Sequence, residues 1–188
     1  MKKPELLAPA GSFEKAKVAF MYGADAVYCG TASLSLRSRA EVDDNDLEKI
    51  IKYAHSIGKK VYAALNIYAW DTNYEEIEKQ VKMLDEVHVD AIIASDGGVI
   101  QKIREIAPNI EIHVSTQANV VSYHAAKFWY DNGAKRVILG RETSKDQIQE
   151  IMKNKPEDLE VEMFIHGALC WAYSGRCFLS EYLSCRSA

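Results

Sequence analysis

The amino-acid sequence predicts a parallel α/β fold, a (β/α) barrel of TIM-like type, from two observations. Short apolar stretches that suit buried strands alternate with longer segments in which apolar residues recur every three or four positions, as one buried helix face requires. A weak internal repeat relates residues 22–30 to residues 132–140, and both copies place a glycine just before an apolar strand. Consecutive βα units cross over right-handed and keep strand direction, so we expect the strands to be parallel.

Strand, turn and helix follow one another along the whole chain. The first helix is expected between Ser12, a suitable N-cap with Glu14 in the first turn, and Gly23, which ends it. The strands are predicted, in chain order, at Leu6–Ala10, Ala26–Cys29, Lys60–Asn66, Ala91–Ser95, Glu111–Ser115, Arg136–Leu139 and Glu160–His166. The buried faces of the later helices are predicted at Leu47, Ile50, Ile51 and Ala54; Ile77, Val81 and Leu84; Val99, Ile100, Ile103 and Ile106; Ala125, Ala126 and Trp129; and Ile148, Ile151 and Met152.

The number of strands falls short of a closed barrel. An eight-unit barrel typically needs about 250 residues, whereas this chain has 188 residues and seven predicted strands. We therefore expect a single barrel-like domain over residues 1–188 that is incomplete and forms the N-terminal part of a longer protein. Uncovered edge strands favour aggregation, so a homodimer or a C-terminal segment is expected to cover the gap.

The composition is that of an ordinary globular protein, with 48% apolar and 27% charged residues. The net charge of −4 argues against a general polyanion-binding surface, although it neither indicates nor excludes nucleic acid. No segment approaches the roughly 20 apolar residues of a membrane span, and Pro9 interrupts the apolar run near the N-terminus. We expect a cytoplasmic protein with no membrane association, whose four cysteines are metal or redox ligands rather than disulfides.

Polar residues follow the carboxyl ends of the predicted strands, where α/β barrels build their active sites. Loop solvation is the alternative explanation for any one of them. Arg37 and Arg39, in the loop after the second strand, would suit a carboxylate or a phosphate, because guanidinium pairs with both bidentately. The segment Asp96–Gly98 opens a helix whose amides could hold an anion. The full set of candidates after the other strands is Asn66, Ser95, Asp96, Ser115, Thr116, Gln117, Asn119, Arg141, Glu142 and His166.

Three cysteines lie within sixteen residues near the end of the chain. Cys170 and Cys177 are separated by six residues, and Gly167 and Gly175 allow the chain to fold both sulfurs toward one point. Thiolates select zinc or the iron of iron–sulfur clusters over hard cations. A structural zinc site prefers a short Cys-x-x-Cys spacing, which the sequence lacks. An inert buried thiol is the alternative, and it suits Cys29, which lies on an apolar strand.

The same segment carries a family resemblance. The run Glu-x-Phe-x-x-Gly-Ala-Leu-Cys that ends at Cys170, followed after four residues by Gly-x-Cys-x-Leu-Ser around Cys177, resembles the signature of peptidase family U32, the collagenase-like peptidases. The likeness extends upstream through the segments 7–11 (Leu-Ala-Pro-Ala-Gly), 36–39 (Leu-Arg-Ser-Arg), 113–117 (His-Val-Ser-Thr-Gln) and 139–142 (Leu-Gly-Arg-Glu). It therefore covers almost the whole chain.

The resemblance implies an oxygen-independent hydroxylation enzyme. Relatives hydroxylate a wobble uridine of tRNA or a ring of the ubiquinone precursor, with prephenate as the oxygen source, and they carry a four-iron iron–sulfur cluster on four cysteines. The first two of those ligands match Cys170 and Cys177, whereas Cys185 stands where relatives are expected to have glycine and is not assigned. The other two ligands would lie further downstream, so we expect the cluster to be absent or incomplete in this chain alone.

The expected roles follow from this interpretation. The predicted catalytic residues are His166, Gln117 and Glu142, and the predicted metal ligands are Cys170 and Cys177. The predicted substrate-binding residues, for a tRNA or a small prephenate-like carboxylate, are Arg37, Arg39, Asn66, Ser115, Thr116, Asn119 and Arg141.

Two other functions compete with hydroxylation. A collagenase-like peptidase could use a cysteine nucleophile with His166 as its base. The sequence has neither a His-Glu-x-x-His zinc helix nor a Gly-x-Ser-x-Gly elbow. A non-catalytic accessory subunit of a hydroxylase complex is the third hypothesis.

Overall fold

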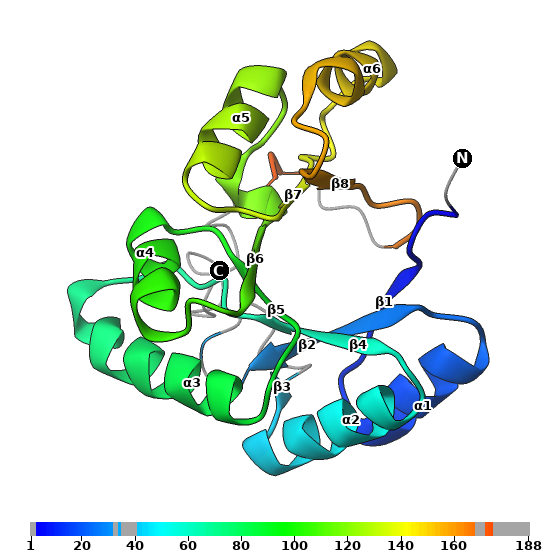
Figure 1. The fold of residues 1–188 in the computed structure, drawn as a ribbon, viewed down its shortest axis with the longest axis vertical. Helices are drawn as coiled ribbons and strands as arrows, with labels where there is room; N and C mark the ends of the chain where they lie inside the picture. Colours follow the sequence, from blue (N-terminus) through cyan, green and yellow to red (C-terminus); the bar gives the residue numbers. More distant parts are fainter. Residues whose placement is uncertain (1–2, 32–33, 35–40, 168–171, 175–188) are drawn as a thin grey trace. The chain divides into compact units, whose positions relative to one another are not determined.

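The computed structural model describes residues 3–31, 34, 41–167 and 172–174 (Figure 1). Strands and helices alternate along this part of the chain. It divides into two compact units, Met1–Ile110 and Glu111–Ala188, and each is described by itself. Five residues to which the sequence drew attention lie outside the described residues: Arg37, Arg39, Cys170, Cys177 and Cys185.

The first unit is a parallel sheet with helices between its strands. The order of the main strands is β1 (Leu7–Pro9), β2 (Ala26–Thr31), β4 (Lys60–Ala64) and β5 (Ala91–Ala94), and every pairing is parallel. The two-residue β3 (Glu41–Val42) also pairs with β2. The helices are α1 (Phe13–Met21), α2 (Asp44–Ser56), the 3₁₀ turn η1 (Asp71–Asn73), α3 (Tyr74–Glu86) and α4 (Gly97–Ile106).

Local signals set the ends of these helices. The hydroxyl of Ser12 accepts a hydrogen bond from the backbone N–H of Lys15 at the start of α1, as the sequence predicted. Gly23, with a φ of +99°, follows the end of that helix in a conformation that a side chain disfavours. The prediction of the first helix is therefore confirmed at both ends.

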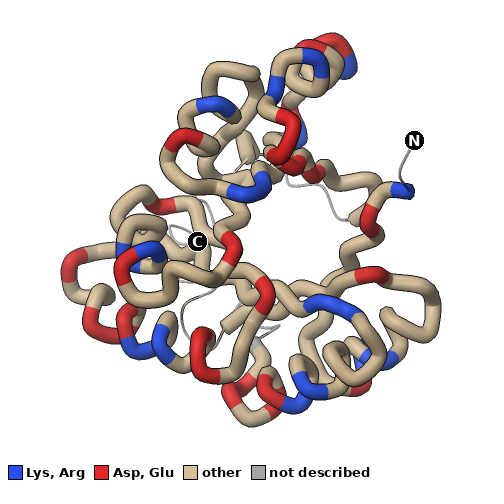
Figure 2. Tube along the Cα trace, in the orientation of Figure 1, with Lys and Arg blue, Asp and Glu red and all other residues tan. Residues whose placement is uncertain are grey.

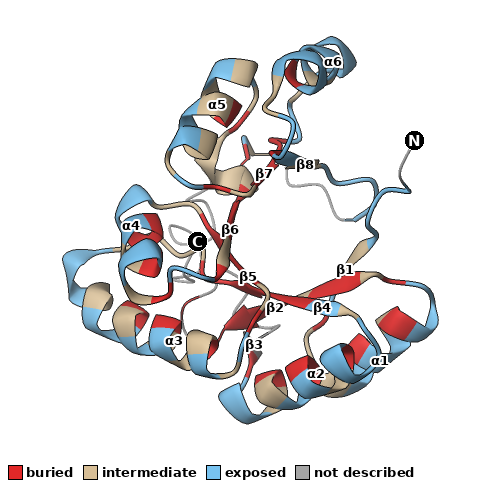
Figure 3. Cartoon of the chain, in the orientation of Figure 1, coloured by how far each residue is buried: buried red, intermediate tan, exposed pale blue. Residues whose placement is uncertain are grey.

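The core lies between the sheet and the inner faces of the helices. Figure 3 shows buried residues on the strands and along one side of each helix of the first unit. All four residues of β5 are buried, as expected for a parallel strand covered on both faces. The predicted faces of α2 and α3 are buried, and so are Val99, Ile100 and Ile103 of α4. Burial of these apolar residues is the main source of stability.

The second unit repeats the same arrangement. Its strands β6 (Glu111–Val114), β7 (Arg136–Ile138) and β8 (Glu160–Glu162) pair in parallel in that order. The 3₁₀ turn η2 (Thr116–Ala118) and α5 (Tyr123–Asp131) connect β6 to β7, and α6 (Lys145–Asn154) connects β7 to β8. Each of the seven predicted strands therefore has a counterpart in the structure, and β3 is a short addition.

The last predicted strand is shorter than the sequence suggested. The apolar alternation predicts a strand to His166, but β8 ends at Glu162. The reason is its partner: β7 has three residues, so the ladder pairs only three residues of β8, and the hydrogen bond from Leu139 N–H to the Glu162 carbonyl closes it. Met163 to His166 continue beyond the strand and are exposed. The expected position of His166 on the polar face of a strand is wrong.

A charged cluster lies along the strands of the second unit, around Arg136. Arg136 is buried, and its guanidinium donates to Glu160 at 2.8 Å and to Glu162 at 3.2 Å across the β7–β8 pair. His113, on the neighbouring strand, is buried with its Nε2 3.6 Å from a carboxylate oxygen of Glu111. Burial lowers the pKa of His113, and Glu111 opposes that effect. The imidazole is therefore held closer to its neutral form.

Charges of both signs are interspersed along the helices (Figure 2). This agrees with the small net charge of −4. Among the described helices, the longest apolar stretch is too short to cross a lipid bilayer.

The Arg136 cluster gives a first prediction. Arg136→Ala removes the guanidinium between two carboxylates and should lower the free energy of unfolding by about 2 to 3 kcal/mol, less than for a fully enclosed pair because Glu160 is 48% exposed. Urea unfolding measures the change. Lys127→Ala, which breaks the exposed pair with Asp131, is the matched control and should cost less than about 1 kcal/mol. Equal effects of the two changes would show that the cluster contributes no more than a surface ion pair.

Candidate functional site

In the second unit, the loops after β6 and β7 leave the carboxyl ends of neighbouring parallel strands. The loop after β6 contains the predicted residues Ser115, Thr116, Gln117 and Asn119. Ser115 is buried, and its hydroxyl accepts a hydrogen bond from the N–H of Gln117 at 3.4 Å. Asn119 ends η2 in the left-handed region, with a φ of +53°. The sequence therefore placed these four polar residues at the correct end of the strand.

Gly140 joins the loop after β7 to the loop after β6. Its N–H donates to the carbonyl of Val120 at 3.0 Å. A Cβ at this position would lie 2.8 Å from the Oε2 atom of Glu142 and 3.1 Å from the Cγ1 atom of Val121. The Gly140 carbonyl accepts from the hydroxyl of Thr143 at 2.6 Å. A side chain at residue 140 would crowd Val121 and displace the Glu142 carboxylate, so glycine suits the close approach of the two loops.

Ser174 connects the loop after β7 to the segment that follows β8. It is fully buried, and its N–H donates a short hydrogen bond to the Oε1 atom of Glu142. Its hydroxyl accepts from the N–H of Arg141 at 3.2 Å. Two adjacent residues of one loop are thus bonded to the backbone and side chain of a residue more than thirty positions away. We call Arg141, Glu142 and Ser174 the loop clamp.

The loop clamp keeps Glu142 ionised. Burial acts to raise the pKa of its carboxyl, but the backbone N–H groups of Glu142 and Ser174, the Ser174 side chain and the charge of Arg141 together outweigh burial, so the pKa lies below its usual range. An ionised carboxylate accepts hydrogen bonds and donates none. The catalytic role predicted for Glu142 is untested, and the structure shows that one carboxylate oxygen is engaged by the protein backbone.

Ser174 is a site residue that the sequence analysis missed. It lies four positions after Cys170 and three before Cys177, near the middle of the cysteine segment. A small polar residue between two candidate ligands was the available signal. Its partners, however, are set by tertiary contacts and leave no periodic pattern in the sequence. The arrangement anchors Ser174, which lies between Cys170 and Cys177 in the sequence, to the loop after β7.

In the first unit, the predicted residues after β4 and β5 differ in whether their side chains make hydrogen bonds within the protein. The Oδ1 atom of Asn66 is buried with no hydrogen-bond partner among the described residues, which suits the predicted substrate-binding role. Asp96 caps α4 by accepting from the N–H groups of Gly98 and Val99 at 2.9 and 3.0 Å. It also accepts from the hydroxyl of Tyr74 at 3.3 Å. The anion site considered at Asp96–Gly98 is wrong, because the carboxylate of Asp96 already occupies those amides.

The remaining candidates are divided between buried and exposed positions. Cys29 is buried on β2, and burial raises its pKa to about 12, so it is protonated and unreactive at neutral pH. His166 is exposed beyond β8, and Arg141 is exposed at the loop clamp. Within residues 3–31, 34, 41–167 and 172–174, no three His, Cys, Asp or Glu side chains are grouped to hold a metal ion.

The arrangement of strands and helices indicates the fold class of the protein. Parallel strands that alternate with helices, with polar loops at their carboxyl ends, are typical of TIM-like α/β proteins. The solved structure of the U32 peptidase Mk0906 has this fold, with a TM-score of 0.69, 13% identity, and coverage of 86% of this chain and 70% of that chain. The fold class predicted from the sequence is confirmed. The model of peptidase family U32 matches residues 11–188, and the chain belongs to that family.

Relatives in the family carry names of two kinds. The tRNA hydroxylation protein P1 of Bacillus subtilis is 46% identical, across 100% of this chain and 44% of its own length. The 23S rRNA 5-hydroxycytidine C2501 synthase of Escherichia coli is 38% identical, across 98% of this chain and 27% of its own length. A collagenase of Porphyromonas gingivalis is 35% identical, across 94% of this chain and 44% of its own length. The chain therefore spans less than half the length of these relatives.

The loop clamp gives a second prediction. Glu142→Ala should release Ser174 and increase the rate at which iodoacetamide alkylates Cys170 and Cys177, because their segment loses its anchor. Glu142→Gln should stay near the wild-type rate, because its amide oxygen still accepts from the Ser174 N–H. Mass spectrometry of tryptic peptides measures each thiol separately, and buried Cys29 serves as an unreactive internal standard.

A control and a pH series complete this test. Glu105→Ala removes an exposed carboxylate of α4 and should change neither rate. The wild-type anchor should be strongest while the Glu142 carboxyl is ionised and should weaken only to the level of the Glu142→Gln protein as the pH falls through the depressed pKa of Glu142, because protonation replaces a charged acceptor with a neutral one. If Glu142→Gln raises the alkylation rates as much as Glu142→Ala does, an acceptor for the Ser174 N–H is not enough to hold the segment. The anchoring role of that hydrogen bond would then be wrong.

Proposed function

We propose that this chain belongs to an enzyme that hydroxylates a base of RNA, with tRNA as the substrate. The observation that carries the proposal is the 46% identity, over the entire chain, with a tRNA hydroxylation protein. The rRNA hydroxycytidine synthase supports the same reaction class, because it modifies a base in a second kind of RNA. Acting on tRNA would place the protein in the cytoplasm.

The loops after β6 and β7 would bind the small co-substrate. Ser115, Thr116 and Asn119 offer hydroxyl and amide groups at the end of β6. The exposed guanidinium of Arg141 would pair with a carboxylate, as a prephenate-like oxygen donor requires. Gln117 and the second oxygen of Glu142 would then orient the reacting groups within the same loops.

A four-iron iron–sulfur cluster would be held by Cys170, Cys177 and two further thiolates. The donor set suits this group, because thiolates are the ordinary ligands of such clusters. When bound, the cluster would supply one-electron redox chemistry. The chain's own contribution would be to hold both thiols at one place, and the contacts of Ser174 with Glu142 and Arg141 support this role.

Proteolysis is the second candidate function, because a relative named as a collagenase is 35% identical over most of the chain. A cysteine peptidase needs a thiolate nucleophile. Cys29 is unsuited to that role, since burial raises its pKa to about 12. The hypothesis would therefore depend on Cys170 or Cys177, with His166 as the base. An accessory subunit without chemistry of its own is the remaining hypothesis.

The cysteine pair gives a third prediction, which separates these functions. Ligation needs both thiols, so Cys170→Ser and Cys177→Ser should each abolish the thiolate-to-iron absorbance after anaerobic reconstitution of the full-length protein. Cys29→Ser is the control and should reconstitute normally. Nucleoside mass spectrometry of cellular tRNA should show loss of the hydroxylated uridine in both ligand variants. Gelatin hydrolysis that persists without iron and depends on only one of the two cysteines would favour the peptidase instead.

The carboxylate partner gives a fourth prediction. Arg141→Lys keeps the charge but loses the planar fork, so it should raise the KM for a prephenate-like carboxylate roughly tenfold or more with a smaller effect on kcat. Lys145→Arg, an exposed exchange on the first turn of α6, is the control and should leave both constants unchanged. Unchanged KM in the Arg141→Lys enzyme would show that this guanidinium is only a solvated surface charge.

A further inference from the structure

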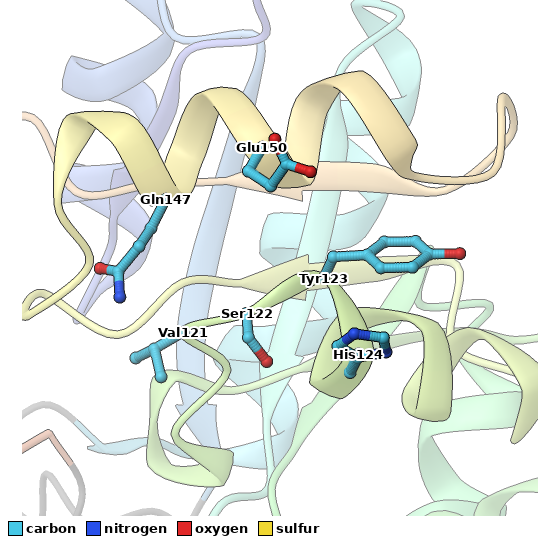
Figure 4. A pocket seen from close by; sticks show the side chains of 6 residues that line it. All are labelled: Val121, Ser122, Tyr123, His124, Gln147 and Glu150. Carbon is cyan, nitrogen blue, oxygen red and sulfur yellow. The ribbon is translucent and has the colours of Figure 1, made fainter.

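A pocket of about 200 Å³ lies within the second unit, between α6 and the beginning of α5 (Figure 4). In Figure 4, α6 forms one side of the pocket, and the loop before α5 with the first turn of that helix forms the other. The residues that line it are Val121, Ser122, Tyr123, His124, Gln147 and Glu150. The volume exceeds the roughly 30 Å³ of a water molecule several times, yet it is below the roughly 300 Å³ at which pockets for drug-sized ligands begin. A single flat ring system is the size of ligand that fits.

The pocket shares a wall with the candidate site. Val121 lines the pocket, and its Cγ1 atom is the one that a Cβ on Gly140 would meet at 3.1 Å. Gly140 also donates to the carbonyl of Val120 at 3.0 Å and directly precedes Arg141 and Glu142. A molecule bound at the loop clamp and one in the pocket would therefore be neighbours.

The hydrogen bonds that the lining residues already make determine which donors and acceptors remain for a ligand. The Oε1 atom of Gln147 accepts from the N–H of Ser144 at 2.8 Å, so its amide NH₂ is left as a donor. The hydroxyl oxygen of Ser122 accepts from the N–H of Ala125 at 3.2 Å, so its proton is left to donate. Two of the lining residues thus each keep a hydrogen-bond donor.

The pocket also offers aromatic faces and an acceptor. The rings of Tyr123 and His124 lie side by side, with centroids 5.3 Å apart. One oxygen of Glu150 accepts from the side chain of Asn154 at 2.6 Å, which leaves the other oxygen as an acceptor. Donors, an acceptor and stackable rings are the groups with which proteins recognise an unstacked nucleobase.

The charge of the lining argues against a phosphate. Glu150 is the one charged side chain among the six residues that line the pocket, and a carboxylate repels an anion. One first-turn amide of each helix is also engaged, because Ser122 accepts from the Ala125 N–H of α5 and Ser144 from the Gln147 N–H of α6. The lining therefore favours a neutral, flat, hydrogen-bonding group.

We propose that this pocket binds a nucleobase of the RNA substrate next to the base that is modified. The proposal rests on the proposed function, since it assumes that RNA is the substrate. Tyr123 supplies the stacking surface, and Gln147 and Ser122 donate to the carbonyl oxygens or ring nitrogens of the base. Binding of the neighbouring base would hold the target nucleotide at the loop clamp.

Anisotropy of a fluorescein-labelled, unmodified tRNA transcript tests the proposal with the full-length protein. Tyr123→Ala should weaken tRNA binding roughly 5- to 100-fold, the usual loss for one stacked base. Tyr123→Phe keeps the ring and should stay within about twofold of wild type. Phe128→Ala is the matched control, because Phe128 is a 58% exposed aromatic residue on the same helix and does not line the pocket. It should leave affinity unchanged.

Salt dependence distinguishes a stacked base from a phosphate contact. Affinity of the Tyr123→Ala protein should be lower at every salt concentration, with the same slope of log K against log salt as wild type. Unchanged affinity of Tyr123→Ala, or an equal loss in Phe128→Ala, would overturn the pocket assignment while leaving the proposed function in place. A wild-type protein that fails to bind tRNA would overturn the RNA substrate itself, and the pocket assignment with it.

Discussion

The close packing of the loops after β6 and β7 at Gly140 is the contact on which the candidate site depends. The Gly140 N–H bonds to Val120, and the space that a side chain would need is filled by Glu142 and Val121. That approach brings Glu142 to the N–H of Ser174 and leaves Val121 as a wall of the adjacent pocket. The loop clamp and the pocket therefore lie within a few residues of each other, on either side of Gly140.

The two ends of strand β7 have different roles: its start contributes to stability, and the loop after its end belongs to the candidate site. Arg136, at its start, is buried against Glu160 and Glu162, and this charge pairing lies where α/β barrels carry stability. Gly140, Arg141 and Glu142 follow its other end, where such proteins place binding and catalysis. Buried charges are tolerated at the first position because each has a partner. At the second position the backbone N–H of Ser174 bonds to one oxygen of Glu142, and the Arg141 side chain is exposed.

The family includes proteins named for hydroxylation and proteins named as proteases. The fold that they share is therefore a poor guide to the reaction. The distinction has to come from the side chains of the site rather than from the architecture. Cys29 is too deeply buried to be a nucleophile. An acidic protein with a net charge of −4 is a weak generic binder of polyanions. Recognition of RNA would then rest on stacking and hydrogen bonds to a few bases, as the pocket lined by Tyr123 and Gln147 would allow.

The sequence by itself determined the features that depend on neighbouring residues. Apolar periodicity placed all seven main strands, and the caps at Ser12 and Gly23 placed the first helix, because these signals act over one or two turns of chain. It also placed Ser115 to Asn119 and Arg141 after the correct strands. Tertiary structure decided the length of β8, which depends on its short partner β7, and the loss of the anion site at Asp96, whose carboxylate caps its own helix. Only the fold could show that Ser174 bonds to Glu142, because that contact joins loops after two different strands and follows no local pattern.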